Sequence, residues 1–308
     1  MGLGHSHDHT HAVDHALRDS AAGIRAVKVS LVVLGVTAVA QLVIVALSGS
    51  VALFADTVHN FSDALTAVPL WIAFSMSRRG ATRRYTYGFG RVEDLAGLFV
   101  LAMIAISAVV AAVQGIRRLI DPVPLTHLGW VAAAGVVGFL GNELVALYRI
   151  RVGNRIGSAA LRADGMHARA DGLTSLAVVA GAVGAALGFP AADPIVGLVI
   201  AVAIGVVLVF AARDVFGRLL DRVDPRLVDE AVTVLAARPG VRAVRRVRMR
   251  WVGHQLEADA ELDIDPSLSL ADAHTVAHSA EHELAHSIPK LSSVIVHAYP
   301  AHDVALSS

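Results

Sequence analysis

The sequence predicts an α-helical membrane protein with six transmembrane helices, followed by a small α+β domain outside the membrane. The chain of 308 residues is 55% hydrophobic and only 17% charged, whereas soluble domains are nearer 45–50% apolar. Apolar runs of about 20 residues, long enough to cross a bilayer, recur before residue 215. Near Asp224 the composition changes to that of a soluble domain.

The six expected spans are separated by residues that end helices. Gly49 starts a tight turn after span one, Pro122 breaks the chain after span three, and Pro190 does so after span five. The apolar runs place the spans approximately at residues 25–48, 51–77, 93–120, 126–149, 156–188 and 193–213.

Arginine is distributed unevenly between the two sides of these spans. On one side of the membrane, the spans are flanked only by Arg117 and Arg118. The positive-inside bias therefore predicts that both termini lie in the cytoplasm, and we expect a bacterial inner (plasma) membrane. The arginines on the cytoplasmic side are Arg78, Arg79, Arg83, Arg84 and Arg91 after span two, and Arg149, Arg151, Arg155 and Arg162 after span four.

The C-terminal part predicts a soluble domain of order αββαβ, which is typical of a ferredoxin-like sheet. Residues 225–237 and 270–287 have helical patterns. Val241–Trp251, Leu256–Asp265 and Ser292–His297 have strand patterns, and the second of these alternates apolar with acidic residues. About 80 residues suffice for one core, more readily in a dimer.

These signals divide the chain into four parts. We expect a disordered, His-rich tail at 1–22, a six-helix domain at 23–215, the ferredoxin-like domain at 216–302 and a short tail at 303–308. The first part lacks the basic start and apolar run of a signal peptide. His-rich tracts bind metal weakly, so we expect this tail to capture metal.

Composition excludes several classes of function. The formal net charge is zero and aromatic residues are few, so nothing indicates a nucleic-acid partner. The chain has no cysteine, which excludes disulfides and thiolate metal sites. A metal site must therefore use histidine, carboxylate, carbonyl or water ligands.

One pattern, DxxHxxxD, occurs twice. Asp56, His59 and Asp63 form the first copy, in span two. The second copy, in span five, consists of Asp164, His167 and Asp171. Ionisable residues inside a membrane are costly and therefore indicate a functional site. Because positions i and i+4 share a helix face, each histidine points the same way as the aspartate that follows it.

Two histidines and two aspartates supply four ligands for a divalent cation. Imidazole with carboxylate favours Zn²⁺ in tetrahedral geometry, while Cd²⁺, Co²⁺ and Ni²⁺ are alternatives. An all-oxygen site would instead favour manganese or magnesium. Protons compete with metal for these ligands. We therefore expect a metal exporter that exchanges metal for protons by alternating access at a midplane site.

Other polar residues in the spans have open roles. Asp56 and Asp164 are candidates for a metal ligand, a proton relay or a structural cap. Asn60 is a candidate either for a hydrogen bond that supports a metal ligand or for helix packing. Glu143 is a candidate for a proton relay or for pairing with an arginine near the membrane edge.

Two other functions compete with transport. An intramembrane metallohydrolase would use a His/Asp site to activate water, but no HExxH occurs and four protein ligands leave no open position for water. A membrane metal sensor that does not transport is the second alternative, although sensing has no need of a midplane site. We therefore expect no enzymatic activity.

The motifs in and around these spans resemble those of the cation diffusion facilitator family. The resemblance extends from about residue 25 to 300 and is specific because several motifs occur together. They are HNFSD in span two, YTYGFGRVEDLAGL entering span three, ADGMHARAD in span five, ADPIVGLVIA in span six, and RWVGHQLEADAELDI in the C-terminal domain.

The resemblance implies a homodimeric metal/proton antiporter with six helices and a cytoplasmic ferredoxin-like domain. It makes His59, Asp63, His167 and Asp171 the transport ligands, in the combination of zinc-type members. Some members have a charge pair that links span three to the C-terminal domain, at the positions of Arg91 and Asp221 in this chain. The alternative is an ion pair in surface loops that has no structural role.

Two departures from the family pattern concern further metal sites. The loop after span two, RRGATRRYTYGFG, has no His, Asp or Glu, so we expect no metal there. In the C-terminal domain, His274 and His297 match ligand positions of the family and Glu261 occupies a third. Arg245 stands at a fourth and cannot bind a cation, so a site there would be altered.

Histidines recur every four residues in the last predicted helix, at 274, 278, 282 and 286. The apolar stripe of that helix is offset by two residues, so the histidines face away from the core. We expect them to face solvent, a partner subunit or bound metal. The candidate residues for a C-terminal zinc site with a regulatory role are His254, Glu261, His274, His282, His286 and His297.

Overall fold

The computed structural model describes residues 7–48, 67–121, 128–189 and 191–301. The chain divides into two compact units. The first, Ser20–Phe216, is called the helical unit below. The second contains the C-terminal domain from Gly217 onward, together with the residues up to Asp19.

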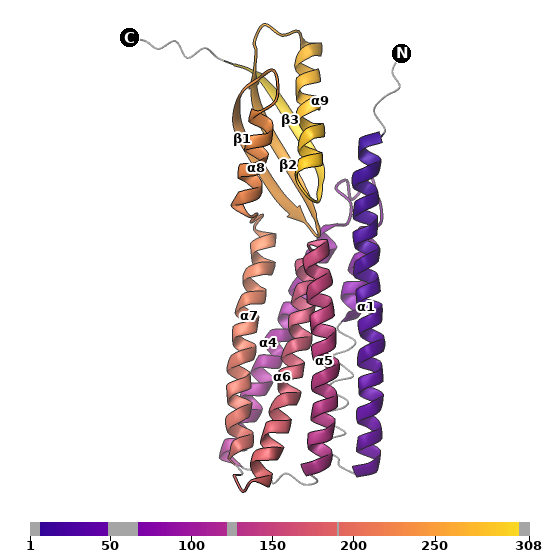
Figure 1. Cartoon of the computed structure of the whole chain (residues 1–308), viewed down its shortest axis with the longest axis vertical. Helices are drawn as coiled ribbons and strands as arrows, with labels where there is room; N and C mark the ends of the chain where they lie inside the picture. Colours follow the sequence, from indigo (N-terminus) through magenta and orange to yellow (C-terminus); the bar gives the residue numbers. More distant parts are fainter. Residues whose placement is uncertain (1–6, 49–66, 122–127, 190, 302–308) are drawn as a thin grey trace, which may run out of the picture. The chain divides into compact units, whose positions relative to one another are not determined.

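Helices make up the described part of the helical unit (Figure 1). The described helices in chain order are α1 (His7–Ser48), α3 (Ala67–Ser77), α4 (Arg91–Ile120), α5 (Leu128–Ile156), α6 (Ala159–Ala186) and α7 (Ala192–Leu219). Four of them are long and apolar enough to cross a membrane: α1, over Leu17–Leu47, and the whole of α4, α5 and α7.

The two remaining predicted spans correspond to α6 and, in part, to α3. Helix α6 has 28 residues and is therefore about 42 Å long, enough to cross a bilayer. Charged side chains such as Arg162 and Arg169 lower its hydropathy. Most of predicted span two lies outside the described residues, so the membrane-spanning helical fold is confirmed while the count of six remains a prediction.

Two helices extend beyond their predicted ends. Helix α1 begins at His7, whereas the sequence predicts a disordered tail over residues 1–22. Residues 7–22 contain neither glycine nor proline, so nothing in them interrupts a helix. Helix α5 continues to Ile156 rather than ending at 149, because the next residue that breaks the helix is Gly157.

A tight turn joins α5 to α6. Gly157 has a φ of 78°, a left-handed conformation that glycine adopts at low cost. Ser158 then caps α6, since its Oγ accepts a hydrogen bond from the Leu161 backbone N–H at 3.0 Å. This turn places α6 antiparallel to α5 and side by side with it.

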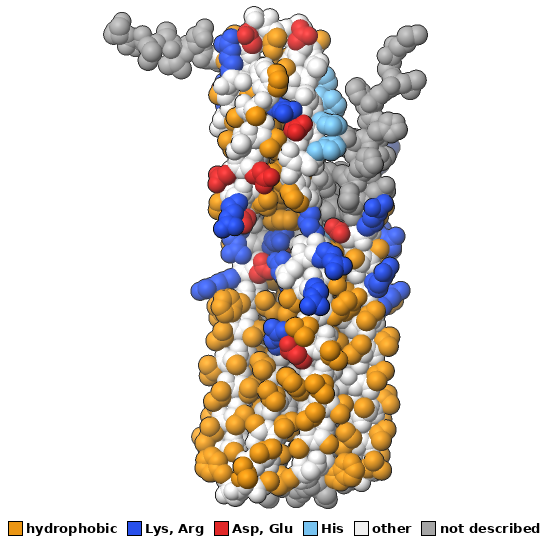
Figure 2. All heavy atoms as spheres, in the orientation of Figure 1, with side chains coloured by type: hydrophobic (Ala, Val, Ile, Leu, Met, Phe, Trp, Pro, Cys, Tyr) orange, Lys and Arg blue, Asp and Glu red, His pale blue; other side chains and the backbone are white. Residues whose placement is uncertain are grey.

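Apolar side chains cover the outside of the helical unit, as Figure 2 shows. Val36 on α1, Leu144 on α5 and Val202 on α7 are each at least 62% exposed. A monomeric soluble protein seldom exposes apolar surface so extensively. The surface is therefore suited to lipid.

The C-terminal domain contains three strands and two helices in the predicted order αββαβ. Strands β1 and β2 pair antiparallel, whereas β2 and β3 pair in parallel, giving the sheet order β1-β2-β3. The elements are α8 (Pro225–Ala236), β1 (Val241–Val252), β2 (Gln255–Ile264), α9 (Leu270–Ser287) and β3 (Leu291–Pro300).

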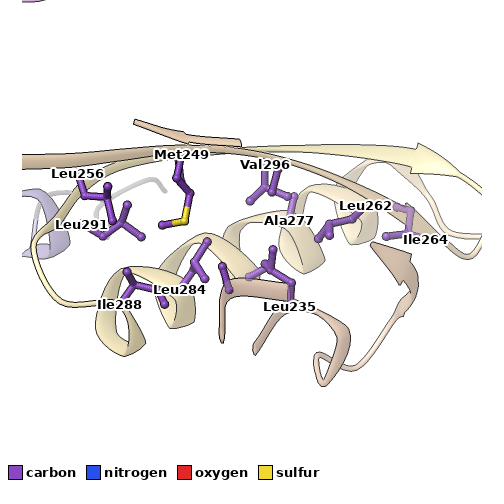
Figure 3. Packing of buried hydrophobic residues seen from close by; sticks show 14 residues of the cluster. Leu235, Met249, Leu256, Leu262, Ile264, Ala277, Leu284, Ile288, Leu291 and Val296 are labelled. Atoms are coloured by element: carbon purple, nitrogen blue, oxygen red, sulfur yellow. The ribbon is translucent and has the colours of Figure 1, made fainter. Parts of the chain in front are cut away.

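One face of this sheet packs on the two helices and forms the core (Figure 3). Leu256 and Leu262 on β2, and Leu235 and Leu284 on the helices, are fully buried. The intervening acidic residues of β2 lie on the opposite face, as the period of two requires. The α9 histidines are exposed and the core residues of α9 are buried, in agreement with the predicted facing of this helix.

Replacing Leu284 with alanine tests this core. Leu284→Ala removes a fully buried side chain and should lower the free energy of unfolding of the domain by about 2–5 kcal/mol. Leu270→Ala is the control, because Leu270 is 88% exposed. Urea unfolding of the full chain measures the free energy of unfolding of both variants. It is followed by the fluorescence of Trp251, after the other two tryptophans are replaced by Trp71→Phe and Trp130→Phe. Equal losses of stability in the two variants would contradict the packing.

Candidate metal site

The second DxxHxxxD copy forms a buried polar face on α6. Asp164, His167 and Asp171 are 0%, 1% and 8% exposed. His167 Nδ1 lies 3.7 Å from Asp171 Oδ1, as expected for positions one helical turn apart. An imidazole and a carboxyl group thus lie together, inside the protein, on a helix long enough to span a membrane.

Glycines on each side of this pair bring α6 close to α5. A Cβ on Gly165 would lie 3.0 Å from the backbone nitrogen of Ile150 and 3.1 Å from Cβ of Arg149. A Cβ on Gly172 would lie 3.3 Å from Cβ of Asn142. Small residues allow close backbone approach between membrane helices. The glycine face of α6 therefore packs directly on α5.

Asp164 forms a buried ion pair with Arg149 of α5. Arg149 Nη1 lies 2.8 Å from Asp164 Oδ2, and the two side chains are 2% and 0% exposed. The sequence analysis instead places Arg149 at the very end of span four, with the arginines of the cytoplasmic side. Because α5 continues past this residue, its guanidinium is held inside the helical unit and gives Asp164 a permanent counter-charge.

The acidic residues of α5 and α7 also pair with arginine. Glu143 receives two hydrogen bonds from Arg169 of α6, at 2.8 and 3.2 Å. Arg118 Nη1 lies 2.7 Å from Asp193 Oδ2. A third pair joins Arg162 to Asp214. Asp171 differs from these acids in lying beside a histidine.

The first DxxHxxxD copy lies outside the described residues. Asp56, His59, Asn60 and Asp63 all fall there. Within the described ranges, no group of three or more His, Cys, Asp or Glu residues is placed to hold a metal ion. His167 and Asp171 are therefore the two members of the predicted ligand set that the structure describes, and the four-residue site remains a prediction.

The six candidates in the C-terminal domain do not form one site within the chain. His274, His282 and His286 lie on the exposed surface of α9. Glu261 and His297 are neighbours on β2 and β3, on the sheet face opposite the helices. His254 is 2% exposed, in the turn between β1 and β2. The sheet thus separates residues that the sequence analysis grouped together.

Glu261 and its neighbours are engaged by arginines of β1. Arg246 pairs with Glu261, and Arg245 pairs with Asp263 while its guanidinium lies 4.8 Å from the ring centre of Tyr299. Cationic groups therefore stand beside the carboxylates on this face. Arg245, as predicted from its chemistry, contributes a cation where a metal would need a ligand.

Hydrogen bonds and ion pairs at this sheet also shift the pKa values of two residues. Hydrogen bonds from the Ser267 hydroxyl and backbone N–H, then one from Arg242, lower the pKa of Asp265 to about 2. The hydrogen bond to Glu257 raises the pKa of Arg250. Both residues stay charged at neutral pH, so the face keeps its ion pairs.

The proposed structural pair of Arg91 and Asp221 spans the two units. Arg91 Nη1 lies 3.4 Å from Asp94 Oδ2, one turn along α4. Asp221 follows α7 and has a positive φ of 58°. Pairing between Arg91 and Asp221 remains a prediction.

Arg149 and Ser175 are site neighbours that the sequence analysis missed. Ser175, 5% exposed, lies one turn beyond Asp171 on the same face of α6. Arg149 lies seven residues after the buried Asn142 on α5. A spacing of seven places two residues on one helix face, and this spacing was the available signal for Arg149.

Two family models match successive parts of the chain. The cation efflux transmembrane domain matches residues 27–220. The cytoplasmic domain of cation efflux proteins, in a model named for dimerisation, matches residues 223–301. The chain belongs to the cation efflux family, the cation diffusion facilitators. The resemblance stated from the sequence is thereby confirmed, and the second match supports homodimerisation.

Relatives of this cation efflux protein extend over most of its length. Two are the probable cation efflux system proteins MT2084 and Rv2025c of Mycobacterium tuberculosis, each 68% identical over 96% of this chain and 90% of the relative. The cation-efflux pump FieF of Serratia proteamaculans is 29% identical over 82% of the chain and 84% of its own length. The chain is accordingly a membrane protein that exports divalent metal cations.

Solved structures similar to this cation efflux protein cover its C-terminal domain. A nickel form of the MamM CTD is 24% identical, with a TM-score of 0.25, and covers 26% of this chain and 100% of the other. An alanine variant of the MamM CTD is 26% identical, with a TM-score of 0.25, and covers 25% and 98% of the two chains.

Removing Arg149 tests the buried ion pair. Arg149→Met should destabilise the helical unit by about 3–5 kcal/mol, because it leaves the Asp164 carboxylate buried without a cation. Arg149→Met combined with Asp164→Leu should recover most of that loss, because it removes both charges. Thermal unfolding of the full chain in detergent measures the three proteins.

Arg151→Met is the matched control for this experiment. Arg151 lies on the same helix, two residues away, and is exposed. The same chemical change there should leave the unfolding temperature nearly unchanged. A loss in Arg151→Met as large as that in Arg149→Met would contradict a structural role for the ion pair.

Proposed function

We propose that this protein exports Zn²⁺ in exchange for protons, at a site formed by His59, Asp63, His167 and Asp171. The observation that carries the proposal is the buried His167–Asp171 pair on α6. Its atoms Nδ1 and Oδ1 are 3.7 Å apart, and both side chains lie inside the helical unit of a metal exporter.

The histidine beside Asp171 supports this assignment. Asp164, Glu143 and Asp193 each lie beside an arginine, whose charge is permanent and bars a metal cation. Histidine instead offers a lone pair when neutral and exchanges its proton near neutral pH. The His167–Asp171 pair is thus suited to bind a cation and to release it.

Charge balance gives the coupling between metal and protons. Two aspartates and two neutral histidines carry two negative charges, which one Zn²⁺ neutralises. When the metal leaves, those negative charges remain in a medium where isolated charge is costly. Protons that bind the emptied ligands restore neutrality, so protons return as metal moves out.

Ligand chemistry supports zinc as the substrate. Imidazole nitrogen together with carboxylate oxygen suits Zn²⁺ in tetrahedral geometry, whereas Mg²⁺ and Mn²⁺ prefer oxygen ligands. Cd²⁺, Co²⁺ and Ni²⁺ accept similar ligands and are the alternative substrates. A metal sensor without transport is the second candidate function, because the same ligands would serve it.

Metal-driven proton flux in proteoliposomes tests the proposed site. Asp63→Ala and Asp171→Ala should each reduce flux to that of empty liposomes, because each removes a charged ligand. Zn²⁺ should drive the fastest flux of wild type when compared with Cd²⁺, Co²⁺, Ni²⁺ and Mn²⁺.

Glu143→Gln with Arg169→Gln is the matched control, because it removes a complete ion pair of the same helices and leaves no unpaired charge. This variant should keep its flux. Undiminished flux in both aspartate variants would move the site to Asp56, Asp164 or Glu143. An inactive wild type with every metal would instead favour the sensor.

Cysteine labelling tests the proposed orientation, with both termini in the cytoplasm of a bacterial cell. The chain has no cysteine of its own, so single cysteines report without background. Leu187, after α6, is 81% exposed, and Ser293 is exposed on β3. An impermeant thiol reagent should label Leu187→Cys in intact cells but Ser293→Cys only after permeabilisation; the reverse pattern would invert the topology.

A further inference from the structure

The exposed side of α9 carries a row of histidines that transport does not use. His274, His278, His282 and His286 follow at intervals of four residues, and all four are exposed. Figure 2 shows histidine side chains gathered in a patch on this helix. Their exposure rules out a packing role in the core of the domain.

The last two histidines are arranged differently from the first two. The rings of His282 and His286 are stacked with centroids 4.3 Å apart and planes inclined by 19°. The rings of His274 and His278 are 6.2 Å apart, and His278 Nδ1 lies 3.4 Å from Glu281. The first pair is thus partly engaged by a carboxylate, whereas the rings of the second pair lie against each other.

A hydrogen bond fixes which nitrogen of His286 holds its proton. His286 Nδ1 lies 2.8 Å from the carbonyl oxygen of His282. Because a carbonyl only accepts, Nδ1 carries the hydrogen and Nε2 carries the lone pair. Metal-binding histidines commonly donate their second ring nitrogen to a carbonyl in this way, which orients the ring.

We propose that His282 and His286 chelate a divalent transition-metal ion on the outer surface of α9. Zinc lies about 2.0–2.1 Å from histidine nitrogen, so two tetrahedral ligands are about 3.4 Å apart. The two rings already lie against each other, and rotation of the exposed side chains brings one nitrogen of each onto one ion. Water completes the coordination.

The position of the pair within α9 favours a cation. The helix ends at Ser287, so both histidines lie in its last two turns, near the negative end of the helix dipole. The nearby carboxylate of Glu283 pairs with Arg238, and Glu281 accepts a hydrogen bond from the Val296 backbone. Imidazole is therefore the chemistry this surface offers, which selects Zn²⁺, Ni²⁺ or Cu²⁺ over Mg²⁺ and Ca²⁺.

Histidine footprinting of the full-length protein in detergent tests this site. Diethyl pyrocarbonate modifies imidazole nitrogens that have a lone pair, and peptide mass spectrometry reports each histidine separately. Zn²⁺ at ten times its Kd should slow modification of His282 and His286 about tenfold, because protection follows 1 + [L]/Kd. Cu²⁺ should protect at lower concentration, and Mg²⁺ should not protect.

A matched variant keeps the number of histidines but breaks the chelate. Ser279→His with His282→Ala moves one histidine to an exposed position seven residues before His286, about 10 Å along the helix. Protection of His286 should then be lost. Equal protection in this variant, or no protection in wild type by Zn²⁺ and Cu²⁺, would overturn the proposal.

The same footprint separates this site from the transport site. In an Asp171→Ala background, protection of His282 and His286 should be unchanged, because the proposed ligands are all on α9. Loss of protection in that background would overturn the α9 site and assign the effect to metal bound at the transport ligands.

Discussion

The helical unit depends on how charge is buried between α5 and α6. Arg149 and Asp164 are almost completely buried and 2.8 Å apart. Neither charge would remain inside the unit without the other, since an isolated ion in a membrane interior is costly. The pair therefore requires α5 and α6 to stay in contact, and the short turn at Gly157 and the close approach at Gly165 make that contact possible.

This contact sets the position of the candidate metal ligands. His167 lies three residues after Asp164, on the same face of α6. Any motion that separated α6 from α5 would break the buried Arg149–Asp164 pair. We infer that α5 and α6 move as one body when the site changes its access, and that the movement is against other helices, in keeping with rocking around a fixed site.

The sequence predicted much of the fold because the relevant signals are local. The αββαβ order follows from periodicity within each element, and the buried His167–Asp171 pair follows from i, i+4 spacing on one helix. Arg149 was misplaced because positive charge at the end of an apolar run ordinarily belongs to a cytoplasmic loop. Only its partner, fifteen residues away on the next helix, shows that it is buried.

For a similar reason, the sequence alone could not show which of the C-terminal candidate residues lie together. Grouping His254, Glu261, His297 and the α9 histidines requires knowing which face of the sheet each occupies. In the fold, Glu261 and His297 lie on the face opposite α9, and Glu261 is paired with Arg246. Residues that share an element, such as His282 and His286, were the only ones whose proximity spacing alone could establish.

The two sides of the C-terminal domain consequently differ in how they can respond to metal. On the open sheet face, Arg245 and Arg246 hold acids of β2 in ion pairs, and a metal cation would have to displace guanidinium groups that never lose their charge. On α9, the imidazole of His286 presents a lone pair to solvent without giving up any ion pair. Sensitivity to metal should therefore reside on the helical side of the domain, where binding links two turns of α9 and stabilises the folded state by an amount that grows with the logarithm of metal concentration.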